Sequence, residues 1–403
     1  MLRGFQRGLR GTGARITILV TVTLIAIAAI LPAVVGAQSP YTTISPATDQ
    51  ANDIQGIYKL TFWLALIVFV GVHIGIASTV LRYRRRSEEA ERPEQIHGHK
   101  VVEIIWTVIP AIILLVIFIP TVRTIYAHDE QTENPEMVVE VYGKQWWWEI
   151  HYAEPDNVAG VVTGNEIRLP QGKRVVFDLY TNNVIHSFWV PQLSGKMDLI
   201  PGHVNKLAID TSTPGYYFGQ CAEFCGDSHA LMRFKVIIQP EEEFNAWVDA
   251  WRAGPTAQSA EFVEDGDVSQ APAVFGLCLA CHQINGTNAS IAPQGLEQQA
   301  LTEDGGPGTA RTAGPDLTLF GCRTTIAAGT LSNTPENLAL WLDDPGSVKP
   351  GNYMQTVIKD DTLSDEQIDQ LVNYLESLQP EGGCTELPVQ PAIDEQVQVS
   401  DPD

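Results

Sequence analysis

Residues 221–232 read Cys221-Ala222-Glu223-Phe224-Cys225-Gly226-Asp227-Ser228-His229-Ala230-Leu231-Met232, a segment with two thiols, one imidazole and one thioether. Soft sulfur ligands combined with imidazole favour copper over hard cations. A single copper ion needs only one cysteine, whereas two cysteines four positions apart on one loop can bridge two copper ions. A disulfide is the alternative for two nearby cysteines in an exported protein, but it leaves His229 and Met232 at this spacing unexplained. The segment therefore predicts a dinuclear copper centre.

A second imidazole is needed, and three histidines in the same part of the chain could supply it. His186 stands at the end of an expected strand, in His186-Ser187-Phe188-Trp189-Val190-Pro191, and His151 and His203 compete with it. Spacing alone does not choose among the three.

Short β-rich stretches, separated by Gly, Pro and Asn, surround the copper segment within residues 128–240. Such a succession of short strands and turn signals is typical of a small antiparallel sandwich or barrel. We expect strands at Met137–Tyr142, Trp146–Tyr152, Glu166–Leu169, Arg174–Tyr180, Lys206–Ile209 and Arg233–Ile238.

The first 127 residues contain three apolar runs. The first, Ile16–Val35, follows several arginines and precedes the small residues Gly36 and Ala37, which is the layout of a cleavable signal peptide over residues 1–37. An uncleaved helix is the alternative. The other two runs, at about 58–81 and 101–126, are each long enough to cross a hydrocarbon core of about 30 Å. They predict a two-helix transmembrane hairpin within residues 38–127, rather than the buried core of a soluble protein.

Basic residues concentrate between the two spans, at Arg82, Arg84, Arg85, Arg86, Arg92 and Lys100. The positive-inside rule places that connection in the cytoplasm. Everything after Ala127 then lies on the extracytoplasmic side of a bacterial cytoplasmic membrane. From His128 onward, 41 Asp and Glu outnumber 13 Lys and Arg. This acidic surface argues against nucleic acid as a partner and favours either a basic protein partner or plain solubility.

Beyond the expected sandwich, residues 241–267 read as a short helix, Glu241–Trp251, followed by a polar linker. Cys278-Leu279-Ala280-Cys281-His282 is then a C-x-x-C-H sequence, the attachment signature of c-type haem. A redox dithiol or half of a zinc site is the alternative. Haem is favoured by the exported location, by the helical pattern of residues 268–380 and by the lack of a second C-x-x-C. Met354 is the only methionine after His282, and no histidine follows His282, so Met354 is the candidate second iron ligand.

Apolar periodicity near 3.6 predicts helices at Pro335–Asp343 and Ser364–Leu378, with Thr334 and Ser364 as N-caps. Cys322 and Cys384 both lie in this exported helical part, where thiols tend to oxidise. We expect them to form a bridge that pins the last helix to the turn after Gly314-Pro315. Residues 381–403 read as an acidic tail.

Four segments resemble the subunit II family of cytochrome c oxidases. Residues 221–232 match its copper motif, C-x-E-x-C-G-x-x-H-x-x-M, without a departure. His186–Gly202 resembles the family's H-S-F-x-V-P…K-x-D…P-G block, Gly143–Trp148 resembles its G-x-Q-W-x-W segment, and Val102–Pro110 resembles the start of its second membrane helix. The resemblance covers about residues 45–251 and implies a cupredoxin-like fold for the sandwich.

The resemblance also implies roles for individual residues. The dinuclear copper ligands would be His186, Cys221, Cys225, His229, Met232 and the backbone carbonyl of Glu223. The Glu223 side chain would help bind a magnesium ion against subunit I, and Trp146 would be the aromatic at which electrons enter. Glu103 matches a glutamate at the mouth of a proton channel into subunit I. The alternative for Glu103 is a carboxylate that only reaches the membrane interface, although an acid in a membrane helix is by default a functional candidate.

The region after residue 268 is similar to class I cytochromes c. Gly314-Pro315-Asp316-Leu317 resembles their G-P-x-L turn, and Lys349–Met354 resembles their distal methionine loop. The similarity implies thioether bonds from Cys278 and Cys281 to haem c, with His282 and Met354 as axial ligands. Residues 286–313 are longer than is usual in that family, and we expect them to form a surface insertion.

The expected architecture is a multidomain membrane protein with a two-helix transmembrane hairpin, an all-β cupredoxin-like sandwich and an all-α cytochrome c domain. As an oxidase subunit II it would receive electrons from a donor protein and work with subunit I, which reduces dioxygen, and with subunit III in the bilayer. A quinol-oxidase subunit II would lack the copper ligands. The sequence also leaves open a nitric-oxide-reducing relative and a free-standing tethered electron carrier or copper-handling protein, although a simple carrier needs only one anchor.

Overall fold

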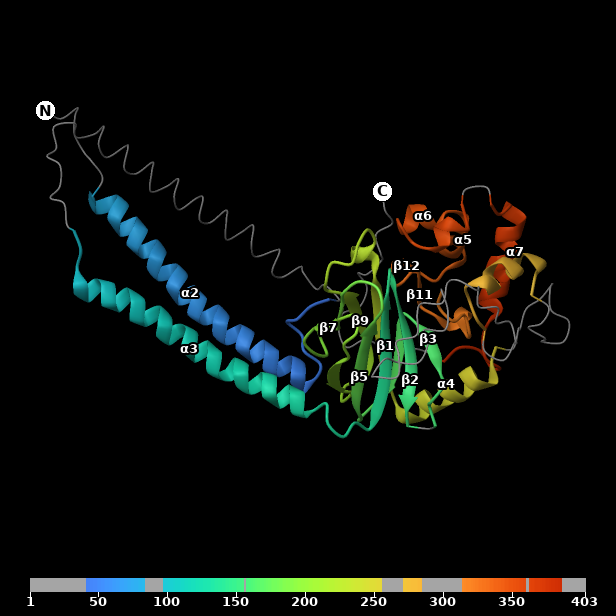
Figure 1. The fold of residues 1–403 in the computed structure, drawn as a ribbon, viewed down its shortest axis with the longest axis horizontal. Coiled ribbons are helices and arrows are strands. Elements are labelled where there is room, and N and C mark those ends of the chain that lie inside the picture. Colours follow the sequence, from blue (N-terminus) through green and yellow to red (C-terminus); the bar gives the residue numbers. More distant parts are fainter. Residues whose placement is uncertain are drawn as a thin grey trace, which may run out of the picture.

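The computed structural model describes residues 41–83, 97–155, 157–255, 271–284, 314–359 and 362–385. The expected signal peptide, most of the basic connection between the spans, most of the polar linker, the expected insertion and most of the acidic tail lie outside these residues. Within them, a helical hairpin, a β-sandwich and a mainly helical C-terminal part follow one another along the long axis of the molecule (Figure 1).

The hairpin consists of α2 (Asp49–Tyr83) and α3 (Lys100–Glu130), which lie side by side (Figure 1). The expected spans lie inside these helices, whose polar ends extend beyond the apolar runs. Both helices are long and apolar enough to cross a membrane, and none of their most apolar window is buried within the protein. A helix that is apolar on every side needs an apolar environment around it. The hairpin therefore has the character of a membrane anchor.

Polar contacts fix the hairpin to the sandwich where α2 begins. The Gln50 amide donates to the side chains of Gln131, just beyond α3, and Asp210, at 2.8 Å each. The Thr48 hydroxyl donates to the Leu193 carbonyl, and the Ala47 amide donates to the Gln192 carbonyl at 2.8 Å. These buried bonds orient the sandwich relative to the two helices.

Two five-stranded sheets form the sandwich, in the orders β3-β2-β1-β5-β8 and β4-β10-β9-β6-β7. The strands are β1 (Met137–Lys144), β2 (Trp147–Glu154), β3 (Val162–Gly164), β4 (Glu166–Pro170), β5 (Arg174–Thr181), β6 (His186–Trp189), β7 (Met197–Leu199), β8 (Asn205–Asp210), β9 (Gly215–Cys221) and β10 (Arg233–Gln239). All six predicted strands are present. The purely antiparallel expectation was wrong, because β1 pairs with β5 and β4 pairs with β10 in parallel. Strand spacing does not encode which distant strands pair.

Four strands were not predicted, and each has a weak local signal. β3, β6 and β7 contain only three or four residues, and β9 carries glycine at both Gly215 and Gly219. A β-carbon on Gly219 would lie only 2.2 Å from the Phe234 ring. Phe234 in turn stacks on Phe188 with ring centroids 4.5 Å apart, in the core between the sheets. Glycine in β9 thus serves core packing at the cost of strand propensity.

The C-terminal part is mainly helical, in line with the prediction, with one short hairpin. It comprises 3-10 helices η3 (Ala273–Ala280), η4 (Phe320–Cys322) and η5 (Met354–Thr356), α5 (Pro335–Asp343), α6 (Pro345–Val348), α7 (Asp365–Ser377), and strands β11 (Thr325–Ile326) and β12 (Leu331–Ser332). Both predicted N-caps are confirmed. Thr334 accepts from the Asn337 amide, and Ser364 forms a capping box with Gln367.

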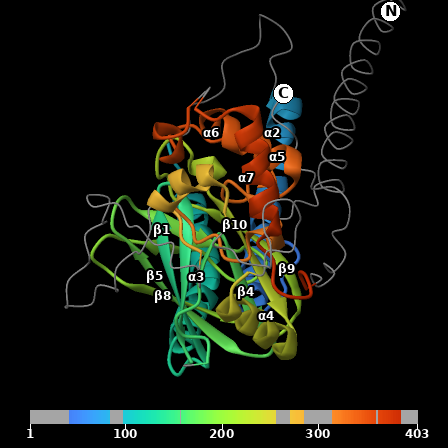
Figure 2. The same cartoon turned by 90° about the vertical axis from the view of Figure 1, so that its right-hand side faces the viewer.

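Helix α4 (Glu241–Ala253) leads from the sandwich toward this C-terminal part. Its buried face, formed by Phe244, Trp247, Val248 and Trp251, packs against the sandwich core beside β4. In both views α4 lies at the bottom, whereas α5 and α6 lie at the top (Figures 1 and 2). The chain just after α6 contacts the copper segment, because the Ser228 hydroxyl donates to the Pro350 carbonyl.

Cys322 and Cys384 form a disulfide, so the expected bridge is confirmed. It ties the segment after α7 to η4, a short helix that follows the Gly314-Pro315 turn. Replacing Cys384 by serine should lower the free energy of unfolding, because a bridge across 62 positions restricts the unfolded chain. The chain-entropy model gives a loss of about 4 kcal/mol. Denaturant unfolding followed by circular dichroism measures it, and the Cys322→Ser/Cys384→Ser double variant should match the single one. Two free thiols in peptides digested without reductant would contradict the bridge.

Candidate functional site

The copper segment forms a loop between β9, which ends at Cys221, and β10, which begins at Arg233. The Cys221 amide donates to the Met232 carbonyl at 2.9 Å and closes the base of the loop. The Sγ atoms of Cys221 and Cys225 lie 3.8 Å apart. Cys225 Sγ also lies 3.6 Å from His229 Nδ1 and 3.9 Å from Met232 Sδ. The four soft or imidazole side chains of the segment therefore converge.

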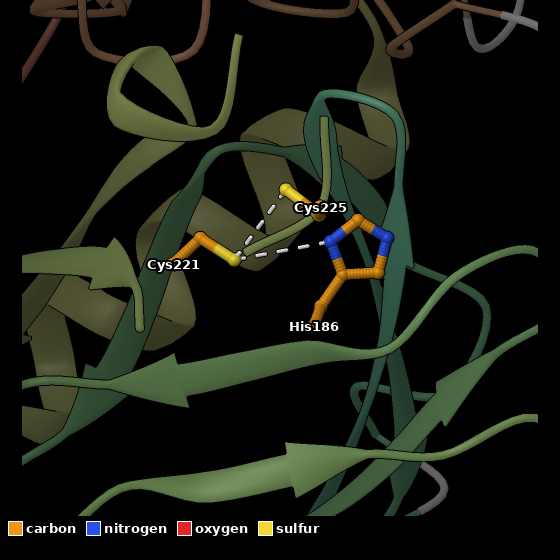
Figure 3. A group of neighbouring side chains, drawn as sticks. All are labelled: His186, Cys221 and Cys225. Atoms are coloured by element: carbon orange, nitrogen blue, oxygen red, sulfur yellow. Dashed lines mark hydrogen bonds between the residues drawn. The ribbon is translucent and has the colours of Figure 1, made fainter. Parts of the chain in front are cut away.

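Of the three candidate histidines, the structure brings His186 to the thiols. Its Nδ1 lies 3.9 Å from Cys221 Sγ, as Figure 3 shows, and the side chain is fully buried. His186 begins β6 rather than ending a strand, and β6 pairs with β9. His151 instead contacts the carboxylate of Glu149 at 2.6 Å, and His203 is exposed on a turn.

An amide that the sequence reading missed orients the His186 ring. Asn183 Oδ1 lies 3.0 Å from His186 Nε2 and accepts a hydrogen bond from it. Nδ1 then carries the lone pair that faces the thiols. A second hydrogen bond of this kind typically fixes the tautomer of a metal-binding histidine. No sequence signal marks Asn183, because its role depends on the turn before β6.

Both thiols are free, which rules out the disulfide alternative for Cys221 and Cys225. A hydrogen bond from Cys225 holds the pKa of Cys221 well below its usual range. The same contact, together with burial, raises the pKa of Cys225. One proton therefore leaves easily, and the second leaves only when a cation compensates the paired negative charge. Two thiolates beside two imidazole nitrogens and a thioether are a donor set that fits copper.

The backbone carbonyl of Glu223 lies 3.2 Å from Cys221 Sγ, so it also faces the cluster. The Glu223 side chain is exposed, and the neighbouring Phe224 ring is 75% exposed. Met232 is fully buried on the inner side. The cluster thus has one closed side toward the sandwich core and one side at the protein surface.

A second site is a cavity of about 190 Å³, partly open to solvent, between the C-terminal part and the sandwich. Its walls include Cys278, Cys281, His282 and Met354 among mostly apolar side chains. His282 Nδ1 donates to the Pro315 carbonyl at 2.8 Å, which leaves the Nε2 lone pair free for a metal. Burial lowers the pKa of His282 and so favours the neutral, ligating form. A β-carbon on Gly314 would lie 2.5 Å from this ring, so the glycine of the predicted turn is required.

These features fit a covalently held haem better than a redox dithiol or a zinc site. Cys278 and Cys281 are both free, and burial raises the pKa of each, that of Cys278 to about 12. Reactive redox dithiols instead have thiols whose pKa is lowered. Within the described residues, the one cluster with metal-binding geometry is His186, Cys221 and Cys225, and Cys278 and Cys281 are not part of it. Met354 and His282 line the same cavity.

Trp146 lies between the two sites. Its ring lines the haem-type cavity, and its indole nitrogen donates to the Cys225 carbonyl at 2.9 Å. The Gln145 amide donates to the same carbonyl at 2.7 Å, a contact that the sequence reading missed. Only 9% of Trp146 is exposed, because the C-terminal part covers it.

Glu103 lies in the first turn of α3, far from both sites at the other end of the hairpin (Figure 1). Its carboxylate accepts from the His99 backbone amide at 3.0 Å, and His99 Nδ1 accepts from the Val102 amide. Glu103 therefore has a capping role that the sequence reading missed. The signal was present, because a glutamate in the first turn complements the helix dipole.

Family models agree with this organisation. The model for the cytochrome c oxidase subunit II transmembrane domain matches residues 41–124, and that for its periplasmic domain matches residues 157–239. A cytochrome c model matches residues 268–379. Cytochrome c oxidase subunit 2 of Alkalihalophilus pseudofirmus is 35% identical over 346 residues, which cover 84% of this chain and 90% of that protein.

The chain belongs to the cytochrome c oxidase subunit II family. The subunit 2 of Bacillus sp. (strain PS3) is 38% identical across 74% of this chain and 80% of that protein. The subunit 2 of Bacillus subtilis is 32% identical across 89% and 98%, respectively. Membership makes the chain a component of an oxidoreductase complex, and its two soluble parts imply copper and haem binding. The hairpin and the periplasmic domain fit a membrane protein with its soluble parts on one side.

Proposed function

We propose that the chain is the subunit through which electrons enter a respiratory cytochrome c oxidase, passing from a donor through haem c and dinuclear copper to subunit I. Subunit I would reduce dioxygen to water and translocate protons. The observation that carries this proposal is the position of Trp146, which contacts the copper loop and lines the haem-type cavity. When bound, the two groups would supply reversible storage of single electrons.

The copper residues would hold the metal pair with little movement. His186, Cys221 and Cys225 come from β6, the end of β9 and the loop between β9 and β10, and all three are buried. His229, Met232 and the Glu223 carbonyl complete the set. Because the loop base is closed by a backbone hydrogen bond and packed on the core, its ligands are preorganised. Such rigidity suits electron transfer, which requires little change in geometry.

The cavity residues would attach and ligate haem c. Cys278 and Cys281 would form the thioethers, and His282 and Met354 would ligate the iron. A methionine ligand raises the reduction potential relative to a second histidine. The Pro315 carbonyl would keep the His282 ring oriented through its bond to Nδ1.

The exposed side of the copper loop would face subunit I. Glu223 is exposed there and would help bind magnesium at that contact, beside the exposed ring of Phe224. Subunit III, the bilayer around α2 and α3, and a donor protein would complete the partners. The membrane would be the bacterial cytoplasmic membrane, with both soluble parts on its extracytoplasmic side.

The copper assignment predicts one unpaired electron shared between two copper nuclei in the oxidised protein. Electron paramagnetic resonance should show the corresponding mixed-valence hyperfine pattern. Cys225→Ser should abolish it, because a hydroxyl is a poor soft bridging ligand, while the haem absorption stays unchanged. A pattern from a single copper nucleus in the native protein would contradict the dinuclear centre.

The haem assignment predicts the weak near-infrared sulfur-to-iron band in the oxidised native protein. Met354→His should keep a six-coordinate haem, remove this band and lower the reduction potential. Potentiometric titration of the haem absorption measures the shift. Absence of the band in the native protein at neutral pH would show that Met354 is not the ligand.

Glu103 would take up protons for subunit I, and its capping bond allows a clean test. Glu103→Gln keeps an oxygen that can accept from the His99 amide but removes the titratable group. It should slow turnover of the assembled oxidase while the haem and copper spectra stay unchanged. Glu103→Ala should slow turnover equally and also cost roughly 1 kcal/mol of helix stability through the lost cap. Unaltered turnover in Glu103→Gln would leave Glu103 with its capping role alone.

A further inference from the structure

Three consecutive residues of the methionine loop contact the copper side of the molecule. Lys349 Nζ donates to the Trp146 carbonyl and, at 2.9 Å, to the Leu231 carbonyl in the copper loop. A weaker contact at 3.4 Å reaches the Ala327 carbonyl in the C-terminal part. The three N–H groups of the ammonium thus face three carbonyl oxygens. Two of these lie across the junction between the C-terminal part and the sandwich.

The next two residues continue the same junction. The Ser228 hydroxyl, in the copper loop, donates to the Pro350 carbonyl. Gly351 lies against the Trp146 ring so closely that a β-carbon there would be 2.9 Å from a ring carbon. Trp146 is therefore held between the copper loop, through Cys225, and the methionine loop, through Lys349 and Gly351. Three residues farther on, the loop carries Met354.

Lys349 is as buried as Lys144, but of the two only Lys144 has a carboxylate partner among the described residues, Glu149. The Lys349 side chain is only 3% exposed, and no carboxylate pairs with it among the described residues. A buried ammonium is costly unless its donors are satisfied. Lys349 meets this condition with carbonyl oxygens, and burial lowers its pKa to about 7. A lysine whose only role was solubility would remain at the surface.

We infer that Lys349 is a positioning residue that locks the methionine loop onto Trp146 and the copper loop, and so fixes the approach of the haem site to the copper site. This inference rests on the proposed function, because it assigns the junction a role in electron transfer between the two sites. The lock acts through backbone carbonyls, so its effect is on distance and orientation rather than on ligation. Electron-transfer rates fall steeply as the separation between two centres grows.

Other contacts between the same two parts provide a matched control. The Thr324 hydroxyl, in the C-terminal part, donates to Glu166 at 2.6 Å and accepts from Lys235 Nζ at 2.8 Å. These residues stabilise the interface but contact neither Trp146 nor residues 221–232. Thr324→Val removes the hydroxyl and keeps the shape of the side chain. It therefore tests the attachment of the C-terminal part to the sandwich while the contacts of Lys349 stay intact.

The experiment compares the native chain, Lys349→Met and Thr324→Val in the assembled membrane complex. After flash reduction of the haem by a soluble ruthenium photoreductant, Lys349→Met should slow electron transfer to copper several-fold, because the methionine loop is no longer held against Trp146 and the copper loop. Haem absorption, the haem potential and the copper resonance should stay as in the native protein. Thr324→Val should leave the rate unchanged. A native rate in Lys349→Met would overturn the inference.

A second measurement needs neither bound group. Amide hydrogen exchange, read by mass spectrometry on peptides covering 225–232 and 349–354, should accelerate in Lys349→Met and not in Thr324→Val. Ser228→Ala, which removes the bond from the copper loop to the Pro350 carbonyl, should accelerate exchange in the same two peptides and slow electron transfer. Unchanged hydrogen exchange in both Lys349→Met and Ser228→Ala would overturn the inference that Lys349 positions the methionine loop. Absence of copper or haem signals in the native complex would instead contradict the proposed function, and the exchange result would still decide the lock.

Discussion

Pairing of β6 with β9 is the constraint on which the copper site depends. Phe188 lies opposite Cys221 in this pair, so His186, two residues earlier, reaches the base of the copper loop. On the other side of β9, Gly219 lies opposite Phe234 of β10 and leaves room for its ring, which stacks on Phe188 of β6. The same few residues therefore determine the packing of the core and the position of the copper ligands. A close-packed core resists displacement of these residues.

Hydrogen bonds to backbone carbonyls connect the copper loop to its neighbouring loops. The Cys225 carbonyl accepts from Gln145 and from Trp146, so the loop between β1 and β2 follows the position of the copper loop. The Trp146 carbonyl accepts from Lys349. Each step joins main chain to a side chain that is buried or nearly so, where hydrogen bonds are electrostatically stronger than in water. The separation of the two sites is thus determined by main-chain positions, which vary less than side-chain rotamers.

The sequence predicted what is encoded locally. The donors on residues 221–232, the C-x-x-C-H segment and the N-caps Thr334 and Ser364 all depend on neighbours within a few positions. What it could not predict depends on residues far apart in the chain. Spacing alone did not choose His186 over His151 and His203; the family motif pointed to it, and the pairing of β6 with β9 brings it to the thiols. The parallel pairs of β1 with β5 and β4 with β10 depend on the whole sandwich. Lys349 looked like part of a haem-loop motif, because its contacts with Trp146 and Leu231 span more than one hundred positions.

Covalent fusion lowers the affinity that contacts between the C-terminal part and the sandwich must supply. Two separate proteins would lose translational and rotational freedom on binding, and a few hydrogen bonds would not offset that loss. In one chain, the second part is present at a high effective concentration, so each contact needs to contribute only a modest free energy. The contacts of Lys349, Ser228 and Thr324 can then select one orientation rather than supply the whole affinity. That orientation places the protein's own methionine loop against the Trp146 ring, where it leaves only 9% of the residue exposed.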